Sequence, residues 1–266
     1  MPTNHINDVF TVWVKTTPTD LILSCWNSWI ENGYNVTIYV DDAYGTDWKL
    51  SGKLHAKIQV KHLRSLGFVS FDYTEGKLLH LIDLWRFIIL KKLGGTWLDS
   101  DVYLIARIPH NPIIISSEHS LKAGAFKSKL SKKPNIGCLR FPPNHPFVNA
   151  VVEKITPTTK EDTEDGINQT SKMLKFIKLL KTKKWSKINK YVVDPQMFCP
   201  IPWCFAKEIY MSDKSNSFKT KYGLEFDYTD ETTAGIHLWN NLATNKHKIN
   251  FLEKSWNKNS LFAMIS

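Results

Sequence analysis

Apolar and polar positions follow two different periods along the first part of the chain. Residues 9–14 ("VFTVWV") form a β-branched and aromatic run, and residues 34–42 ("YNVTIYVDD") alternate before ending in two aspartates, so both are predicted strands. Between them, residues 21–33 ("LILSCWNSWIENG") have helical spacing and stop at Gly33, where a left-handed cap fits. Strand, helix and strand with short connections predict the start of a parallel α/β unit.

Two further helices are predicted before residue 96. Residues 54–67 ("LHAKIQVKHLRSLG") favour a helix, and residues 75–95 ("EGKLLHLIDLWRFIILKKLGG") favour a longer one that is closed by Gly94. The segment that follows, residues 96–105 ("TWLDSDVYLI"), is predicted to be extended. The chain therefore leaves a strongly apolar helix through two glycines and enters an acidic segment.

The remaining sequence shows no repeat and no long linker. Residues 111–150 contain runs typical of strands, residues 155–166 are polar and loop-like, and a basic amphipathic helix is predicted over residues 167–182. We therefore expect a single domain over residues 1–266.

The net charge of +10 comes largely from lysines in two runs, residues 122–133 and 172–190. Lysine without interleaved arginine and aromatic residues is weak evidence for reading bases, so we do not expect nucleic-acid binding. The charge is better suited to anionic substrates, or to peripheral membrane contact through the helix at residues 167–182. The other reading of that helix is that its apolar face packs on the core.

The four cysteines include no CxxC pair, which argues against a zinc site. The first residues lack the charged and apolar regions of a signal peptide, and no apolar run approaches the roughly 20 residues of a membrane span. We expect a cytoplasmic protein with free thiols, in the host cytoplasm if the source is viral.

A polar stripe runs along the apolar helix at residues 75–95. His80, Asp83 and Arg86 recur at spacings of three, on one face of a helix that is otherwise apolar nearly all round. Charged groups on a buried helix need a partner or a polar cleft. Either the stripe lines a site, or Asp83 and Arg86 satisfy each other locally.

Asp99 and Asp101 are separated by one residue. In an extended segment both carboxylates face one side and Ser100 faces the other, an arrangement suited to Mg²⁺ or Mn²⁺ and to phosphate oxygens on the metal. The alternative is a pair of solvated loop acids. A haloacid-dehalogenase phosphatase also uses Asp-x-Asp, but there the motif follows the first strand, whereas here it follows Gly94 and Gly95.

Residues 81–102 ("LIDLWRFIILKKLGGTWLDSDV") resemble the signature of glycosyltransferases with the DxD sugar-binding region, the group that includes α-1,6-mannosyltransferases and α-1,4-galactosyltransferases. Residues 145–147 ("HPF"), 198–203 ("FCPIPW") and 237–240 ("HLWN") are similar to further segments of that group. Large clostridial glucosylating toxins share the wider pattern. The combination is more specific than any one motif.

The resemblance implies an α/β protein of the GT-A fold, a Rossmann-like domain with a central mixed, mainly parallel sheet flanked by helices. It implies a nucleotide-sugar donor, a glycan acceptor, Mn²⁺ or Mg²⁺ as cofactor, and transfer of a hexose with retention of configuration. A UDP-sugar is the leading donor, and GDP-mannose stays open. A nucleotide-sugar-binding protein that has lost turnover is the alternative.

The resemblance also implies roles for four residues in the helix and the acidic segment. Asp83 and Arg86 would hydrogen-bond the donor sugar, and Asp99 would reach ribose and sugar. Asp101 would bind the metal directly, with Asp99 as a second ligand. Asp99, Asp101 and Arg86 are the expected catalytic residues.

Three residues outside that region complete the expected site. Trp13 would stack on the donor base, although a tryptophan in the core is the other reading. His237 and Trp239 would close over the diphosphate, with His237 as a further metal ligand or a structural histidine. Cys199 departs from the pattern, since it replaces the aromatic residue of "FYPIPW" in galactosyltransferases.

Overall fold

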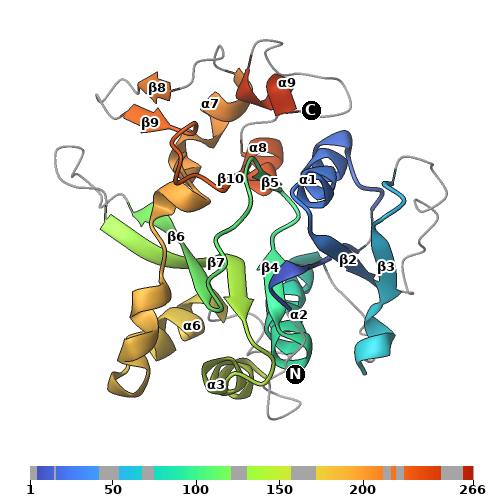
Figure 1. Ribbon diagram of the computed structural model, residues 1–266, viewed down its shortest axis with the longest axis vertical. Helices are drawn as coiled ribbons and strands as arrows, with labels where there is room; N and C mark the ends of the chain where they lie inside the picture. Colours follow the sequence, from blue (N-terminus) through green and yellow to red (C-terminus); the bar gives the residue numbers. More distant parts are fainter. Residues whose placement is uncertain are drawn as a thin grey trace.

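A six-stranded sheet forms the centre of the computed structural model, which describes residues 5–14, 16–41, 54–67, 75–120, 131–156, 172–211, 217–219, 225–246 and 260–265 (Figure 1). Its strands are β1 (Asp8–Val12), β2 (Asn35–Val40), β3 (Gln59–His62), β4 (Gly95–Leu98), β6 (Ile114–Ser120) and β7 (Ser131–Phe141). The strand order is β3-β2-β1-β4-β7-β6. β3, β2, β1 and β4 pair in parallel, while β7 is antiparallel to both of its neighbours. The predicted mixed, mainly parallel sheet is confirmed.

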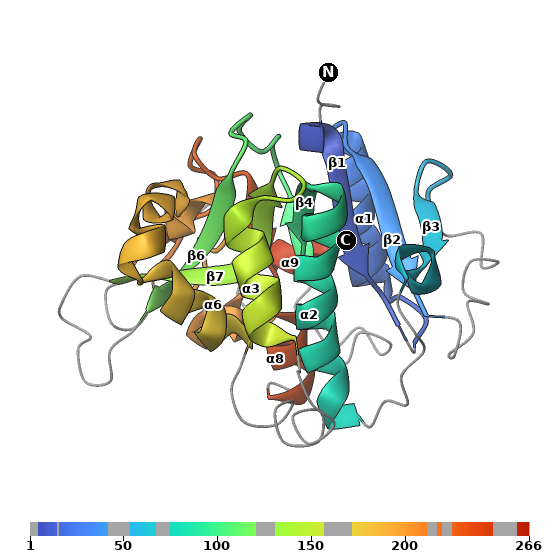
Figure 2. The ribbon, with the colours of Figure 1, turned by 90° about the horizontal axis from the view of Figure 1, so that it is seen from below.

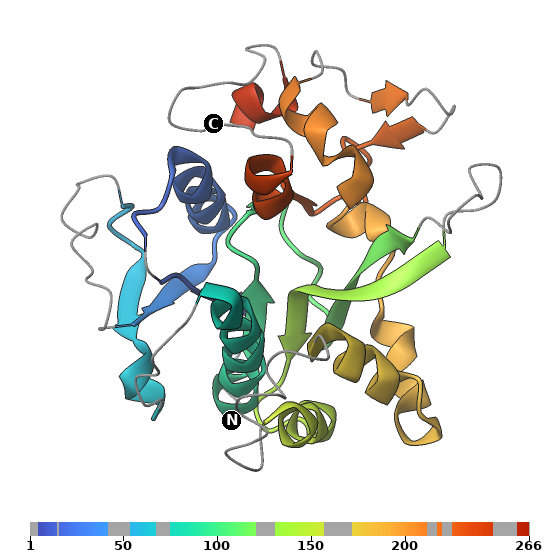
Figure 3. The same ribbon diagram turned by 180° about the vertical axis from the view of Figure 1, so that it is seen from behind.

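Helices cover both faces of this sheet. One face carries α1 (Asp20–Glu31), α7 (Ala206–Met211), α8 (Asn240–Asn245) and α9 (Leu261–Ile265). The other carries α2 (Glu75–Leu93), α3 (Pro146–Ile155), α6 (Lys172–Leu180) and a 3₁₀ helix at Lys183–Tyr191. Figures 1 and 3 show α1 and α2 on opposite sides of the sheet, and Figure 2 shows α2 beside α3.

Two small antiparallel sheets and several short 3₁₀ helices complete the described structure. β5 (Val102–Leu104) pairs with β10 (Gly235–His237), and β8 (Ser217–Lys219) pairs with β9 (Glu225–Asp227). The short 3₁₀ helices lie at His5–Asn7, Leu63–Leu66, Pro195–Met197 and Trp203–Phe205. The β5–β10 pair is the most important for the site, because it brings His237 beside the segment that contains Asp99 and Asp101.

The junction between α2 and β4 depends on its two glycines. Gly94 and Gly95 have φ values of +67° and +83°, a region that side chains disfavour. A Cβ on Gly94 would lie 2.5 Å from Pro143 Cδ, and one on Gly95 would lie 2.8 Å from a ring carbon of Phe10. The glycines thus allow the chain to turn sharply and bring β4 against β1.

Most predicted elements are present, but the helix predicted over residues 54–67 is wrong. This stretch contains strand β3 followed by the 3₁₀ helix at Leu63–Leu66. The edge of β2 offers unpaired backbone groups, and Thr37 to Val40 pair with residues 59–62. Hydrogen bonding along that edge outweighs a weak helical pattern in a short polar segment. Asp42, at the end of the second predicted strand, lies outside the described residues.

The predicted basic helix is present as α6 over Lys172–Leu180, and residues 167–171 lie outside the described part of the chain. Its apolar side packs on the core through Phe176, Ile177 and Leu180, which are all buried. Within the described ranges, no helix combines the length and the apolar character needed to cross a membrane.

Candidate active site

The Asp-x-Asp segment forms a turn at the carboxyl end of β4. The backbone N–H of Val102 donates to the carbonyl of Asp99 at 3.0 Å, which bends the chain between β4 and β5. The prediction of an extended segment is therefore wrong at residues 99–101. The predicted orientation of Ser100 is wrong for the same reason, because its hydroxyl lies 3.0 Å from the Thr11 hydroxyl and lines the same cavity as the two aspartates.

A cavity of about 540 Å³ opens at the carboxyl ends of β1 and β4. In parallel α/β sheets this edge is where ligands bind. All seven residues predicted for the site line this cavity, although they come from four separate segments: Trp13, Asp83, Arg86, Asp99, Asp101, His237 and Trp239.

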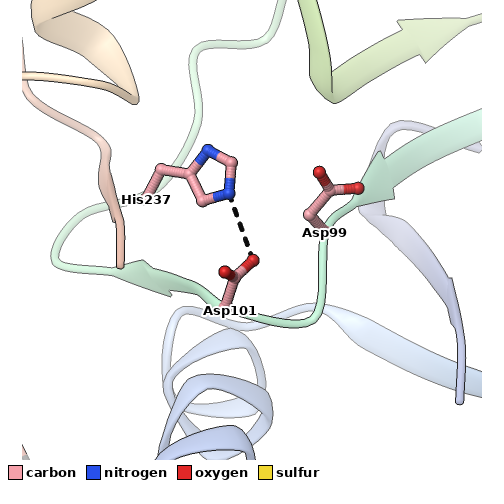
Figure 4. A group of neighbouring side chains, drawn as sticks. All are labelled: Asp99, Asp101 and His237. Atoms are coloured by element: carbon pink, nitrogen blue, oxygen red, sulfur yellow. Dashed lines mark ion pairs between the residues drawn. The ribbon is translucent and has the colours of Figure 1, made fainter. Parts of the chain in front are cut away.

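Asp99, Asp101 and His237 meet at one point of this cavity (Figure 4). Each offers a ligand atom, and the three atoms lie within 4.8 Å of one another. His237 Nε2 is 3.2 Å from Asp101 Oδ1. The pairing of β10 with β5 sets this geometry, since it places His237 opposite Val102, the residue after Asp101.

The Asp99 carboxylate is held from two sides. The Arg86 guanidinium donates through Nη2 to Asp99 Oδ1 at 2.8 Å, and the indole N–H of Trp97 donates to the same oxygen, also at 2.8 Å. The second oxygen, Oδ2, faces Gly137, where a Cβ would lie 3.3 Å from it and 3.4 Å from His237 Cε1. Glycine at position 137 therefore keeps the space beside Oδ2 and the imidazole open.

Both terminal nitrogens of Arg86 are engaged within the protein. Only 4% of it is exposed, its Nη1 donates to the carbonyl of Ile136 at 2.8 Å, and its Nη2 is 3.3 Å from Asp83 Oδ1 as well as bonded to Asp99. The guanidinium also lies over the Trp97 ring, 4.9 Å from its centroid. Both readings of the polar stripe thus apply, because the Asp83–Arg86 pair exists and also lines the cavity. The side chain of His80 lies outside the described part of the chain.

Asp101 and His237 form a coupled acid–base pair. Burial opposes ionisation of both groups, but the mutual attraction and hydrogen bond of the pair outweigh it. The pKa of His237 is raised well above its usual value, and the pKa of Asp101 is lowered. The backbone N–H of Asn240 also stabilises the Asp101 carboxylate, since it donates to Oδ2 at 2.8 Å.

The pKa of Asp99 shifts in the other direction. Burial raises it, although the positive charges of Arg86 and His237 act against this rise. The two aspartates of one motif therefore differ in their affinity for a proton, which reflects their different partners.

His237 and Trp239 stack on each other, with ring centroids 4.0 Å apart. Trp239 adopts a φ of +53°, so the segment is not extended there, yet both rings reach the cavity. The segment containing "FCPIPW" supports them from behind: Cys199 Sγ lies 4.0 Å from His237 Nδ1, and the Trp239 indole donates to the carbonyl of Ile201 at 2.9 Å. Cys199 therefore contacts the site histidine and does not line the cavity.

Trp13 lies just after β1, at the cavity wall. It is partly buried against the core, with an edge-to-face contact to Trp26 at 5.8 Å, and its indole donates to the carbonyl of Thr16 at 2.6 Å. The ring is therefore fixed in place while it still lines the cavity.

The donor set fits a divalent cation. Carboxylate oxygens suit Mg²⁺ and Mn²⁺, and an imidazole is also compatible with Mn²⁺. One oxygen of each carboxylate is already bonded within the protein, Asp99 Oδ1 by Arg86 and Asp101 Oδ2 by Asn240. An ion that replaces the proton between Asp101 Oδ1 and His237 Nε2 would have these two atoms and Asp99 Oδ2 as ligands, with the open space at Gly137 beside them.

Several residues of the site were not predicted from the sequence. Thr11, Trp97, Ser100 and Asn240 line the cavity, and Gly137 adjoins Asp99 and His237. Trp97 carries a visible signal, because an aromatic residue precedes the Asp-x-Asp segment. Asn240 ends the "HLWN" segment, but its contact to Asp101, like the position of Gly137, depends on distant segments and was not predicted.

Residues 8–120 match the family model described as "Glycosyltransferase sugar-binding region containing DXD motif". This stretch contains β1, α2, β4 and both aspartates of the candidate site. The match over this part of the chain supports a glycosyltransferase. No match was found among curated proteins.

One solved structure supports the GT-A fold of the chain. The chain is similar to "PaToxG Glycosyltransferase", with 13% sequence identity and a TM-score of 0.50 over 69% of this chain and 73% of that one. It also matches the UDP-bound glycosyltransferase domain from the YGT toxin, with 11% identity and a TM-score of 0.39 over 65% and 67% of the two chains. At these identities the likeness concerns the fold.

Proposed function

We propose that this glycosyltransferase, folded as a single domain over residues 1–266, transfers a hexose from a nucleotide diphosphate sugar to a hydroxyl group of a glycan acceptor. A UDP-sugar is the leading donor, and GDP-mannose is the second candidate. The observation that carries the proposal is the convergence of Asp99, Asp101 and His237 at the edge of the sheet where α/β proteins bind nucleotides.

The three converging residues would hold Mn²⁺ or Mg²⁺ through two carboxylates and one imidazole. A bound divalent cation would stabilise the negative charge that grows on the diphosphate as the bond to the sugar breaks. A cation would bind Nε2 of His237 only after the imidazole has released its proton to water, so metal binding and proton release would be linked. Trp239 stacks on His237 and limits its rotation over the diphosphate.

Donor recognition would be divided between the two ends of the cavity. Trp13 offers an indole held by its contacts to Trp26 and Thr16, which suits stacking on the base. Asp83 lines the cavity with 22% of its side chain exposed and would accept hydrogen bonds from sugar hydroxyls. Arg86, which is committed to Asp99, Asp83 and the Ile136 carbonyl, would position these carboxylates.

Retention of configuration would proceed by front-face attack. A double displacement needs a carboxylate that is available as a nucleophile. Among the described residues that line the cavity, the carboxylates are Asp83, Asp99 and Asp101. Arg86 lies against Asp83 and Asp99, and His237 and Asn240 hold Asp101, so none is placed as a free nucleophile.

The direct test is turnover of a panel of UDP-hexoses and GDP-mannose with Mn²⁺, with release of nucleoside diphosphate as the readout. We expect one UDP-hexose to be turned over, EDTA to stop the reaction, and proton NMR of the product to show the anomeric configuration of the donor. Metal-dependent binding of UDP without turnover of any donor would favour the inactive binding protein. An inverted product would overturn retention.

A further inference from the structure

A strongly basic surface lies on the side of the molecule that α3 and α6 cover. Residues 172–190 contain eight lysines and no aspartate or glutamate. Six of these lysines are exposed, and together they form what we call the lysine face: Lys178, Lys181, Lys183, Lys184, Lys187 and Lys190. The face continues from α6 into the 3₁₀ helix at Lys183–Tyr191.

The apolar side of α6 is not available to a partner. Phe176, Ile177 and Leu180 are buried in the core that α6 shares with α2 and α3. Leu174 is an exception, with 45% exposed. Apart from polar side chains, a partner of this surface would therefore meet lysines and one leucine, so that charge and not deep insertion would hold it.

A cavity of about 490 Å³ adjoins the lysine face, between α3 and the 3₁₀ helix. Trp185 lines it and is fixed by an edge-to-face contact with the buried Phe147 at 5.4 Å. Lys154, Lys184 and Thr182 supply groups that suit a phosphate, and Glu153 is the one acid among the lining residues. Its volume is within the range of about 300–1,000 Å³ that is typical of small-ligand sites.

We propose that the lysine face docks on an anionic lipid bilayer and that the cavity beside Trp185 receives the phosphorylated headgroup of one lipid. Clusters of four to eight lysines or arginines are typical of surfaces that bind acidic phospholipids. Trp185 is a poor platform for a nucleobase, because Lys184 Nζ already lies 5.0 Å above its ring centroid. Phe147 also packs against the Trp185 ring in an edge-to-face contact. A lysine cluster without arginine is poorly suited to reading bases. It is better suited to an extended anionic surface such as a bilayer.

The docked orientation leaves the active site accessible. Figure 1 shows α3 and α6 at the lower end of the molecule and β5, β10 and α8, which carry or adjoin Asp101, His237 and Asn240, towards the upper end. The donor could then enter from the aqueous phase while the enzyme stays at the membrane surface. This inference does not depend on which donor or acceptor the enzyme uses.

The test compares two triple variants of equal charge in vesicle co-sedimentation. Lys184→Gln/Lys187→Gln/Lys190→Gln removes half of the lysine face. As a control, three exposed lysines outside the face are changed together: Lys57→Gln/Lys61→Gln/Lys207→Gln. Vesicles consist of phosphatidylcholine alone, or of phosphatidylcholine and phosphatidylserine in equal parts.

We expect the wild-type protein to bind only the anionic vesicles, with affinity that falls as salt rises. The face variant should bind at least about thirtyfold more weakly, whereas the control should lose less than about threefold. Equal losses in the two variants, or binding to phosphatidylcholine alone, would refute the docking face. Stronger competition by duplex DNA than by vesicles of equal phosphate content would assign the face to nucleic acid and overturn the proposal.

The headgroup site has its own variant. When phosphatidylinositol phosphate replaces phosphatidylserine at equal total charge, wild type should bind more tightly, and Lys154→Gln should lose that preference while it keeps its affinity for phosphatidylserine. If Lys154→Gln has no effect on the preference, the cavity is not a headgroup site. Turnover of a soluble donor should be the same in all variants, which distinguishes lost docking from lost folding or lost activity.

Discussion

The buried contact between Arg86 and Asp99 should contribute to stability as well as to the site. Arg86→Met removes charged hydrogen bonds to Asp99 and to the Ile136 carbonyl, each 2.8 Å long, and leaves Asp99 beside an apolar side chain. Hydrogen bonds to charged groups contribute about 1.5–3 kcal/mol each, and removing one partner of a buried pair costs about 3–5 kcal/mol. We therefore expect the free energy of unfolding to fall by about 3–5 kcal/mol.

Asp99→Asn should cost less, about 1–3 kcal/mol, because Trp97 can still donate to the amide oxygen and Arg86 keeps Asp83 and the Ile136 carbonyl. The double variant Arg86→Met/Asp99→Asn should lose less than the sum of the two single losses, by about 1–3 kcal/mol. Urea unfolding of the three variants without added metal gives these values.

Two results would refute this reasoning. If Arg86→Met costs less than about 1 kcal/mol, the guanidinium is not a structural anchor. If the single losses add, Arg86 and Asp99 do not depend on each other. Asp83→Asn serves as the matched control, since it also removes a carboxylate near Arg86 but leaves the contact to Asp99 intact.

Three other changes test separate parts of the site. Gly137→Ala places a methyl group beside Asp99 Oδ2 and His237 Cε1. Mn²⁺ affinity measured by calorimetry should therefore fall at least about tenfold while the fold is kept. Unchanged Mn²⁺ affinity would show that the ion lies elsewhere. Mn²⁺ affinity should rise with pH above about 6.5, because the raised pKa of His237 keeps a proton on the imidazole in that range and the proton competes with the ion. If Mn²⁺ affinity does not change with pH in that range, His237 is not a ligand. Trp13→Ala should weaken UDP binding by about 1–3 kcal/mol with a smaller effect on the melting temperature of the free protein, whereas a large stability loss with normal UDP affinity would make Trp13 a core residue.

Local signals in the sequence were sufficient for the elements that surround the site. The helical period of α2, the glycines at 94 and 95 and the β-branched run of β1 each determine structure through neighbouring residues. The placement of Asp99 near Trp13 was implied by the family resemblance, and the parallel pairing of β1 with β4 explains it.

Contacts between distant segments could not be predicted in this way. Strand β3 forms because β2 offers an edge, and a local pattern favoured a helix there instead. The pairing of β5 with β10 brings His237 to Asp101 across more than a hundred residues. The engagement of Arg86 by the Ile136 carbonyl likewise depends on β7, which is remote in the sequence.

Asp99, Asp101 and His237 form the one candidate metal site among the described residues, and we propose that they bind a divalent cation for catalysis. The measurement that tests it most directly is a titration of Mn²⁺ followed by electron paramagnetic resonance, in the presence of UDP, on wild type, Asp101→Asn and the control Asp83→Asn. We predict one tight Mn²⁺ site in wild type and in Asp83→Asn, and an affinity at least about a hundredfold lower in Asp101→Asn, a loss of about 2.7 kcal/mol or more. Equal Mn²⁺ affinity in all three proteins would contradict the claim.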